Sequence, residues 1–227
     1  MASYLFRRSG ISVGIVADWI GWTPDAVYSV GVGQHHEEID VMKESWPGCR
    51  FAGCEPHPLI YRSEKDKFPG VLSHVALSDY VGTGMLYTKA THKDGSSLRP
   101  HEQMEREHYD TIEVPVSTLD SLWGKPIGNH VLLWIDCEGS EAAVLRGGPR
   151  FLRGVEAVNV EMTPNPHGFG WDTPKDIHNL LKGYGFLQQW IHTQRAGQYD
   201  AIYVRRHLFQ PKYCCSVWQV EEYNASA

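Results

Sequence analysis

Apolar and polar positions along the chain predict an alternation of buried strands and amphipathic helices. Short apolar runs at 26–30 and 49–54 predict strands, and so does the run at 131–135. A continuous apolar run bounded by turn residues is typical of a parallel sheet that is covered on both faces. Between the first two runs, apolar residues recur at helical spacing over 37–46, with acidic residues in the first turn, which predicts a helix.

The middle of the chain is less regular. The pattern predicts a short helix at 59–65, a strand at 71–77, an excursion with a glycine-rich turn at 81–88 and a strand at 155–160. Residues 89–110 are polar, rich in histidine and without a clear period. Such a stretch indicates a long loop or a lid.

The last third of the chain closes the sheet in a different way. Residues 173–176 read Thr-Pro-Lys-Asp, which predicts a capped helix start with proline at the first helical position. Two strands are then expected at 186–192 and 201–204, with a short polar turn and no helix between them. We therefore predict an α/β fold whose parallel order ends in a β-hairpin, which is unusual for dinucleotide-binding domains.

Length and charge limit the possible partners. The chain has 227 residues with 42% hydrophobic content, so we expect one domain over 1–227, with a core of about 26–206 and an extension at each end. Lys plus Arg total 21 against 27 for Asp plus Glu, a formal charge of -6 without a basic run, so we expect no nucleic-acid partner. No apolar stretch approaches the ~20 residues of a membrane span, so we expect no membrane partner.

The cysteines and the first residues indicate a compartment. Five cysteines, an odd number, are scattered along the chain, which favours a reducing environment. The first residues carry charge but no apolar core or cleavage site, so no signal peptide is expected. The sequence thus predicts a cytoplasmic protein.

Carboxylates follow the apolar run at 131–135. Asp136, Glu138 and Glu141 come directly after it, with Gly139 among them. Because parallel sheets bind ligands beyond the carboxyl ends of their strands, Asp136 and Glu138 should stand over a crevice. The alternative is that Glu138 and Glu141 only complement the macrodipole of the next helix, which suits Glu141 well.

Glycines near the first strand suggest a nucleoside site. Gly31 and Gly33 end that strand, where they let a backbone approach a ligand. Glu55 follows Gly33 by 22 residues at the end of the next strand, which suits a carboxylate that receives both ribose hydroxyls. His36 stands where a dinucleotide site would carry a third glycine, which argues against NAD.

Six motifs occur in an order that resembles the FkbM-type S-adenosylmethionine-dependent methyltransferases. They are VYSVGVG, CEPHP, VALSDYVGTGMLY, VPVSTLDSL, LLWIDCEGSEAAVLRGG and VNVEM. The fifth is the most specific, since the family pattern is an apolar strand, I-D-x-E-G-x-E and a helix. The resemblance implies a Rossmann-like seven-stranded, mostly parallel sheet with an antiparallel last strand and helices on both faces. It also implies S-adenosyl-L-methionine as methyl donor and usually an oxygen nucleophile on the acceptor.

The resemblance also implies site residues. The residues it implies for cofactor binding are Ser29, Gly31, Val32, Gly33, Glu55, Pro56, Leu77, Ser78 and Asp136. Asp136 is the leading candidate for the base or acceptor anchor, with Glu138 nearby and His167 as a second possible base. The rival mechanism uses Mg²⁺, to which Asp136, Glu138 and Glu161 could supply hard oxygen ligands.

Two other functions stay open at this point. Many members of the family carry Asp at the position of Ser29, so a nucleoside-binding or interaction domain without catalysis is one alternative. An NAD-linked oxidoreductase is the other. For the methyltransferase we expect a small-molecule or saccharide acceptor, and the sequence predicts neither its identity nor the oligomeric state.

Overall fold

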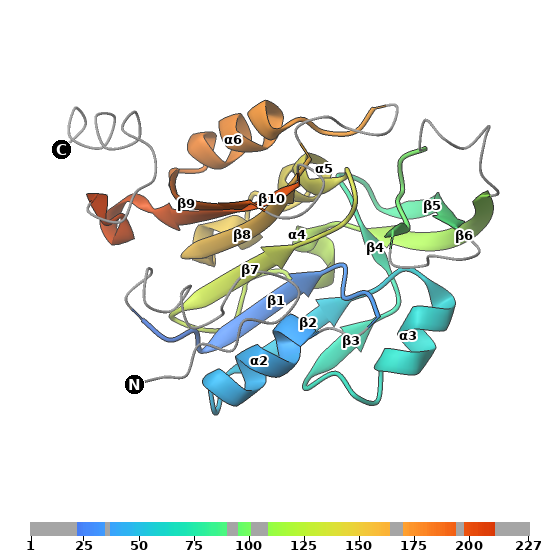
Figure 1. The fold of residues 1–227 in the computed structure, drawn as a ribbon, viewed down its shortest axis with the longest axis horizontal. Helices are drawn as coiled ribbons and strands as arrows, with labels where there is room; N and C mark the ends of the chain where they lie inside the picture. Colours follow the sequence, from blue (N-terminus) through green and yellow to red (C-terminus); the bar gives the residue numbers. More distant parts are fainter. Residues whose placement is uncertain are drawn as a thin grey trace.

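The chain folds around one large sheet with helices on both faces (Figure 1). It is seen here in a computed structural model. The residues that the structure describes are 22–34, 37–89, 95–100, 109–163, 170–193 and 198–211. Among them is no helix whose length and apolar character would let it cross a membrane.

The large sheet has the predicted seven strands. Across the sheet they are β3 (Val71–Ser73), β2 (Arg50–Cys54), β1 (Ala26–Val30), β7 (Val131–Ile135), β8 (Ala157–Met162), β10 (Tyr199–Arg205) and β9 (Phe186–Thr193). The pairs from β3 to β8 are parallel, whereas β10, the last strand among the described residues, runs antiparallel to both of its neighbours. The Rossmann-like, mostly parallel sheet with an antiparallel last strand is therefore confirmed.

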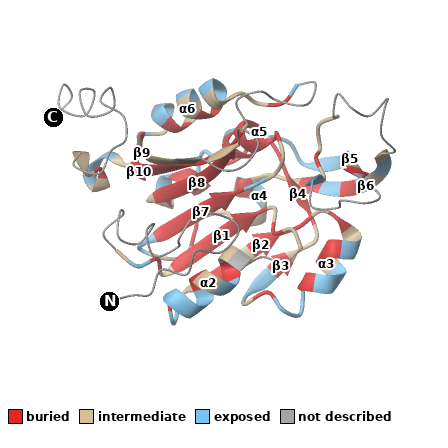
Figure 2. Cartoon of the chain, in the orientation of Figure 1, coloured by how far each residue is buried: buried red, intermediate tan, exposed pale blue. Residues whose placement is uncertain are grey.

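The strands at the centre of the sheet are buried along their whole length, as Figure 2 shows for β1, β7 and β8. Burial on both faces explains why their sequences are continuous apolar runs. One face packs against α4 (Leu119–Leu122), α5 (Glu141–Arg146), the 3₁₀ turn η3 (Phe151–Gly154) and α6 (Pro174–Gly183). The other face packs against α2 (Glu37–Ser45), while α3 (Pro58–Glu64) follows β2 and the 3₁₀ turn η5 (Arg206–Leu208) follows β10.

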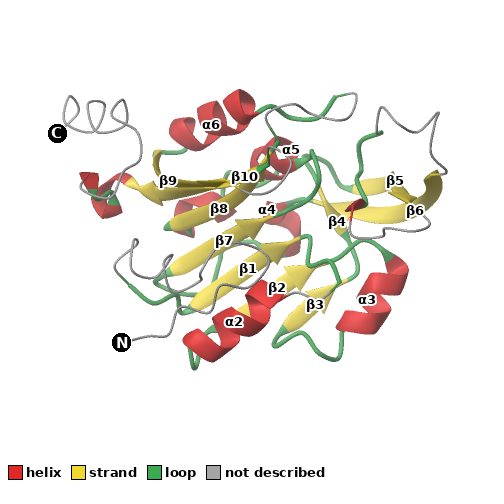
Figure 3. Ribbon diagram, viewed as in Figure 1, coloured by secondary structure: helices red, strands yellow, loops and turns green. Residues whose placement is uncertain are grey.

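A second, smaller sheet corrects the expectations for the middle of the chain. Its order is β4 (Ala76–Leu77), β6 (Tyr109–Ser117) and β5 (Gly82–Lys89), and Figure 3 shows it beside the large sheet. The strand predicted at 71–77 is in fact two strands in different sheets. Its partner β2 ends at Cys54, which pairs with Ser73, so the chain beyond has no neighbour in the large sheet and β4 pairs with β6 instead.

The structure also differs from the expected excursion at 81–88 and the expected loop at 89–110. The excursion at 81–88 is β5, which pairs antiparallel with β6 along its full length. Within the expected loop at 89–110, the described residues 95–100 contain a bridge between Ser97 and Tyr87 of β5. Of the remaining residues of that loop, 90–94 and 101–108 lie outside the described residues, while 89 belongs to β5 and 109–110 belong to β6.

Candidate functional site

The register of the sheet brings polar residues from distant parts of the sequence into one row. Val30 pairs with Cys54 on one side and with Ile135 on the other, and Ile135 pairs with Val160. The residues that follow these four therefore lie at the same level, at the carboxyl ends of adjacent strands. They are Gly31, Glu55, Asp136 and Glu161.

Gly31 occupies the narrowest place in this row. Its φ is +77°, and a Cβ built on it would lie 1.8 Å from the carbonyl oxygen of Asp136. The backbone N–H of Gly31 donates to the carbonyl of Cys54 at 3.1 Å, and that of Asp136 donates to the carbonyl of Val30 at 2.9 Å. The second bond holds the start of the loop after β7 against the end of β1. Only glycine fits both the conformation and the space.

A pocket of about 280 Å³ opens above this row. It is lined by Val30, Gly31, Val32, Gly33, Gln34, Glu38, Cys54, Glu55, Pro56, Ile60, Ala76, Leu77, Leu86, Ser96, Leu98, Asp136, Cys137, Glu138 and Ser140. Four of these residues are carboxylates, and none of the described lining residues is Lys, Arg or His. The charge of the described walls therefore favours a cationic ligand.

Glu55 is held in place by backbone donors on two sides. The N–H of Gly33 donates to Glu55 Oε2 at 3.0 Å, and the N–H of His57 donates to Oε1 at 2.7 Å. The side chain of His57 in turn accepts from Leu59 and caps the start of α3. A carboxylate has about four acceptor positions, so these two donors orient the group without using all of them.

The segment from Asp136 to Ser140, called the acidic loop below, has an unusual backbone. Glu138 has a φ of +53° and is the one non-glycine residue with a positive φ in the described part of the chain. A left-handed conformation at such a residue costs about 1–3 kcal/mol, and it persists only where the surroundings enforce it. Gly139 follows with a φ of +94°.

The buried side chain of Glu141 holds part of the backbone of the acidic loop in place. Its carboxylate accepts from the backbone N–H of Gly139 at 3.0 Å and of Cys137 at 3.3 Å. Glu141 is buried, and this burial raises the pKa of its carboxyl. The macrodipole interpretation of Glu141 is therefore incomplete, because its side chain turns back to hold the acidic loop.

Other parts of the chain hold the acidic loop from outside. Ser97 Oγ donates to the carbonyl of Glu138 at 2.6 Å. The N–H of Asp172 donates to the carbonyl of Gly139 at 3.2 Å, and its Oδ2 accepts from Ala143 in the first turn of α5 at 3.1 Å. Trp171 covers Gly139 so closely that a Cβ there would lie 2.3 Å from the indole.

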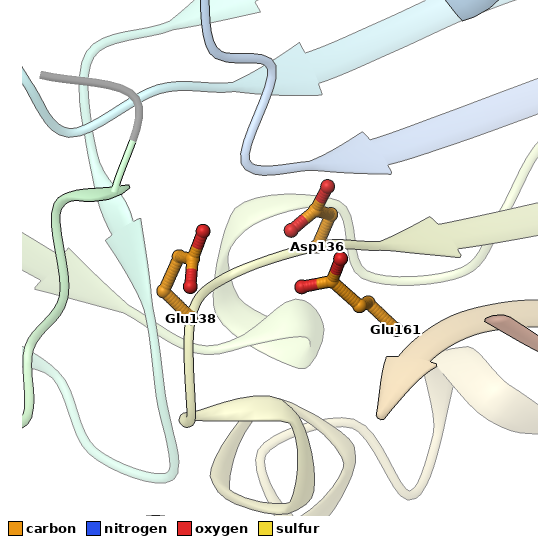
Figure 4. Close-up of side chains that lie close together, drawn as sticks. All are labelled: Asp136, Glu138 and Glu161. Atoms are coloured by element: carbon orange, nitrogen blue, oxygen red, sulfur yellow. The ribbon is translucent and has the colours of Figure 1, made fainter. Parts of the chain in front are cut away.

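Three carboxylates meet at the end of β7 and β8. Oxygen atoms of Asp136, Glu138 and Glu161 all lie within 4.8 Å of one another. Figure 4 shows the three side chains close together, with Asp136 and Glu138 on the loop after β7 and Glu161 at the end of β8. Such a set of like charges, partly removed from water, disfavours full ionisation.

The pKa values in this cluster follow from that arrangement. Asp136 is accessible from the pocket, yet protein surrounds it, and burial together with the charges of Glu161 and Glu138 raises its pKa well above the ordinary value. Burial, with the charges of Glu138 and Asp200, raises the pKa of Glu161 to about 8. The cluster therefore has a strong tendency to keep a proton or to attract a cation.

Two thiols in the pocket wall also keep their protons. Burial raises the pKa of Cys54 to about 12 and raises that of Cys137 well above its ordinary value. A thiol that stays protonated is a poor nucleophile. These cysteines thus act as small apolar wall residues.

The structure gathers most of the predicted site residues in one place. Those that line the pocket are Gly31, Val32, Gly33, Glu55, Pro56, Leu77, Asp136 and Glu138. Ser29 and Ser78 are buried and are not among the lining residues. Glu161 is buried beside Asp136, and His167 lies outside the described residues.

Sequence reasoning missed several wall residues. Glu38 comes from α2, and Leu86 and Leu98 come from the small sheet and the segment bridged to it. The acidic first turn of the helix at 37–46 was a usable signal for Glu38. Leu86 and Leu98 had none, because their place depends on strand pairing that the pattern did not predict.

Comparisons with solved structures find similar folds at low identity. The magnesium protoporphyrin IX methyltransferase from Synechocystis PCC 6803 with bound SAM is 13% identical over 90% of this chain and 86% of that chain, with a TM-score of 0.47. The precorrin-6y C5,15-methyltransferase from Geobacter metallireducens GS-15 is 12% identical over 88% and 92%, with a TM-score of 0.45. Neither likeness bears on the acceptor or on the role of any residue.

A comparison with protein families is more specific. A search of curated proteins finds no match to the chain. Residues 29–187, which are more than half of the chain and include every pocket wall described above, match the methyltransferase FkbM domain. The chain therefore belongs to the family of FkbM methyltransferase domains.

Proposed function

We propose that the chain transfers a methyl group from S-adenosyl-L-methionine to a hydroxyl of a small-molecule or saccharide acceptor. The single observation that carries the choice of donor is the charge of the pocket, whose described walls contain four carboxylates and no cationic side chain. S-Adenosylmethionine has a sulfonium and an ammonium group, which such walls attract. Membership in the methyltransferase family supports the same donor.

The charge of the pocket also separates this donor from NAD. A pyrophosphate is usually held by a helix N-terminus and open glycine backbone, where N–H groups and the helix dipole favour negative charge. Here Glu38 and Glu138 line the pocket together with Asp136, so two phosphate charges would meet like charges. An NAD-linked oxidoreductase is therefore disfavoured.

The proposed contacts follow from the pocket walls. Glu55 would accept the ribose hydroxyls, since Gly33 and His57 already fix its orientation. Backbone groups of Gly31 and Val32, which line the pocket, would face the methionine part. Pro56 and Leu77 would border the base, and roles for Ser29 and Ser78 stay predictions.

Asp136 is the proposed base or acceptor anchor. When bound, S-adenosylmethionine supplies an activated methyl group whose transfer leaves a neutral thioether. The acceptor oxygen would form the new bond to carbon as the sulfur–carbon bond breaks, and the hydroxyl proton would pass to a base of the protein. Asp136 lies in the row at the strand ends and is accessible from the pocket, and its raised pKa suits a proton acceptor. His167 stays the alternative base.

Mg²⁺ is the alternative way to activate the acceptor. The oxygen atoms of Asp136, Glu138 and Glu161 lie within 4.8 Å of one another, and carboxylate oxygens suit a hard cation. Turnover in EDTA, with and without added Mg²⁺, separates the two mechanisms. Because Asp136 suits a base without help, we expect only a mild loss in EDTA, and abolished turnover that Mg²⁺ restores would establish the metal mechanism.

Two measurements test the proposal as a whole. Calorimetry with S-adenosylmethionine, S-adenosylhomocysteine and NAD should show binding of the first two only. A methyl-release assay on a pooled acceptor library should then show turnover, and ¹³C-methyl-labelled donor would reveal by its chemical shift whether the methyl is on oxygen. Cofactor binding without turnover on any acceptor would favour the non-catalytic domain, and binding of NAD alone would refute the donor.

A further inference from the structure

The hydroxyl of Ser97 connects the small sheet to the acidic loop. Ser97 Oγ accepts the backbone N–H of Arg99 at 2.9 Å and donates to the carbonyl of Glu138 at 2.6 Å. Because a carbonyl oxygen can only accept, the hydroxyl proton points to the Glu138 carbonyl, while the oxygen accepts from Arg99. Ser97 is buried, so water does not compete for either bond.

The backbone of Ser97 is itself fixed. Its N–H donates to the carbonyl of Tyr87 at 3.0 Å, and its carbonyl accepts from the N–H of Tyr87 at 2.8 Å. Tyr87 belongs to β5, whose ladder with β6 runs over its whole length. Ser97 therefore reaches the acidic loop from a rigid support.

The residues on either side of Ser97 belong to the pocket. Ser96 and Leu98 line the same pocket as Glu138, while the Ser97 side chain lies between that wall and the loop. One short segment thus supplies a wall of the pocket and a tether for one of its carboxylates.

Ser97 binds next to Glu138, the residue with the strained backbone conformation. The peptide that follows Glu138 carries the carbonyl that Ser97 binds, and its orientation is part of the left-handed conformation of Glu138. Glu141 holds the amides of Cys137 and Gly139, whereas Ser97 holds the carbonyl of Glu138. Without the hydroxyl of Ser97, this peptide orientation loses a stabilising hydrogen bond, and Glu138 can relax toward an ordinary backbone conformation.

We propose that Ser97 is a positioning residue that fixes the conformation of Glu138 and so directs its carboxylate toward the bound cofactor. The proposal rests on the proposed function only for the identity of the ligand. It assigns a part in the site to the small sheet, which carries Ser97 through Tyr87.

A double-mutant cycle tests the proposal with S-adenosylmethionine as the probe. In calorimetry, Ser97→Ala should weaken binding by roughly 3- to 10-fold in the otherwise unchanged protein, the range of one lost hydrogen bond. In a Glu138→Gln background the same change should alter affinity by less than about 2-fold, because the carboxylate to be positioned is gone. Equal losses in both backgrounds would overturn the proposal, since Ser97 would then act on the pocket as a whole.

Hydrogen exchange gives a second measurement that needs no ligand. Ser97→Ala should speed exchange of the Cys137 and Gly139 amides by roughly 3- to 10-fold, because the loop opens more easily. Thr111→Ala is the matched control, since Thr111 is exposed on β6 opposite Tyr87 and is not one of the residues that line the pocket. Unchanged exchange in Ser97→Ala would refute positioning. If the unaltered protein fails to bind S-adenosylmethionine, the proposed function fails and exchange alone decides the role of Ser97.

Discussion

Replacing Glu55 by Gln tests the cofactor site and the local fold in one experiment. Both carboxylate oxygens accept a backbone N–H, from Gly33 at 3.0 Å and from His57 at 2.7 Å. A Gln amide has only one oxygen, so in either orientation its NH₂ group meets one of these donors. The variant therefore leaves one backbone donor without an acceptor, although its shape is nearly unchanged.

The cost to stability follows from that unsatisfied donor. An unpaired buried N–H costs about 1–3 kcal/mol. For a chain of this size, 1 kcal/mol lowers the melting temperature by about 2–4 °C, so we expect a decrease of roughly 3–10 °C without ligand.

The cost to binding is separate. Loss of charge-assisted hydrogen bonds to the ribose should weaken S-adenosylmethionine by about 1.5–3 kcal/mol, which is roughly 10- to 150-fold in Kd. Calorimetry well below the melting transition measures it. Glu113→Gln, an exposed change on β6, is the control for the loss of one charge.

Two results would contradict this reasoning about Glu55. A melting temperature equal to that of the unaltered protein would mean that the two backbone bonds do not matter in solution. A Kd within about 2-fold of the unaltered value would mean that Glu55 does not bind the ribose.

Three further predictions concern the same row of residues. Asp136→Asn should leave cofactor binding nearly unchanged, while methyl transfer falls by about 100-fold or more. The melting temperature should be equal or higher, because the change removes one of several like charges. Near-normal turnover would place the base elsewhere, and His167 would be the next residue to test. Glu161 keeps its proton in the folded state up to a pH of about 8, against 4.5 for an ordinary glutamate, so its contribution to stability is complete below about 4.5 and is lost as pH rises through about 8. Chemical denaturation across this range should show a decline that Glu161→Gln flattens, and an unaltered slope would show that Glu161 titrates normally. Gly31→Ala should unfold the protein or abolish cofactor binding. The control is Gly48→Ala, because Gly48 has a similar φ of +88° but open space around it, and this change should lower the free energy of unfolding by only about 1–2 kcal/mol in melting experiments. Similar losses in both variants would show that the contact with Asp136 is unimportant.

The sequence predicted the large sheet well because its signals are local. The apolar runs that became β1, β7 and β8 are buried on both faces, and the capped start of α6 is written in Thr173 and Asp176. Each signal depends on a few neighbouring residues. The seven strands and the antiparallel last strand were expected from the resemblance to the FkbM family.

The small sheet was missed for a physical reason. Ile112, Val114 and Val116 alternate with polar residues in β6, which is a strand signal, but Pro115 between them lowers confidence in a strand. The break of 71–77 into β3 and β4 depends on where β2 ends, which no local pattern reveals.

The carboxylates of the site could be predicted from the sequence, but the contacts that hold them in place could not. Asp136, Glu138 and Glu55 stand at strand ends, where polar residues after apolar runs are visible in the sequence. The inward turn of Glu141 and the tether from Ser97 depend on contacts between segments that only the folded chain brings together. The left-handed conformation of Glu138 is equally hidden, because glutamate has no preference for it.

The row of residues at the strand ends links ligand binding to folding of the whole domain. Its members come from positions 31, 55, 136 and 161, so no contiguous fragment short of most of the core contains them all. A truncated or partly folded chain should therefore lack even weak affinity for the cofactor. Conversely, cofactor at 100 times its Kd should add about 2.7 kcal/mol to the free energy of unfolding. The amount of protein that survives proteolysis should then rise and fall with the supply of cofactor.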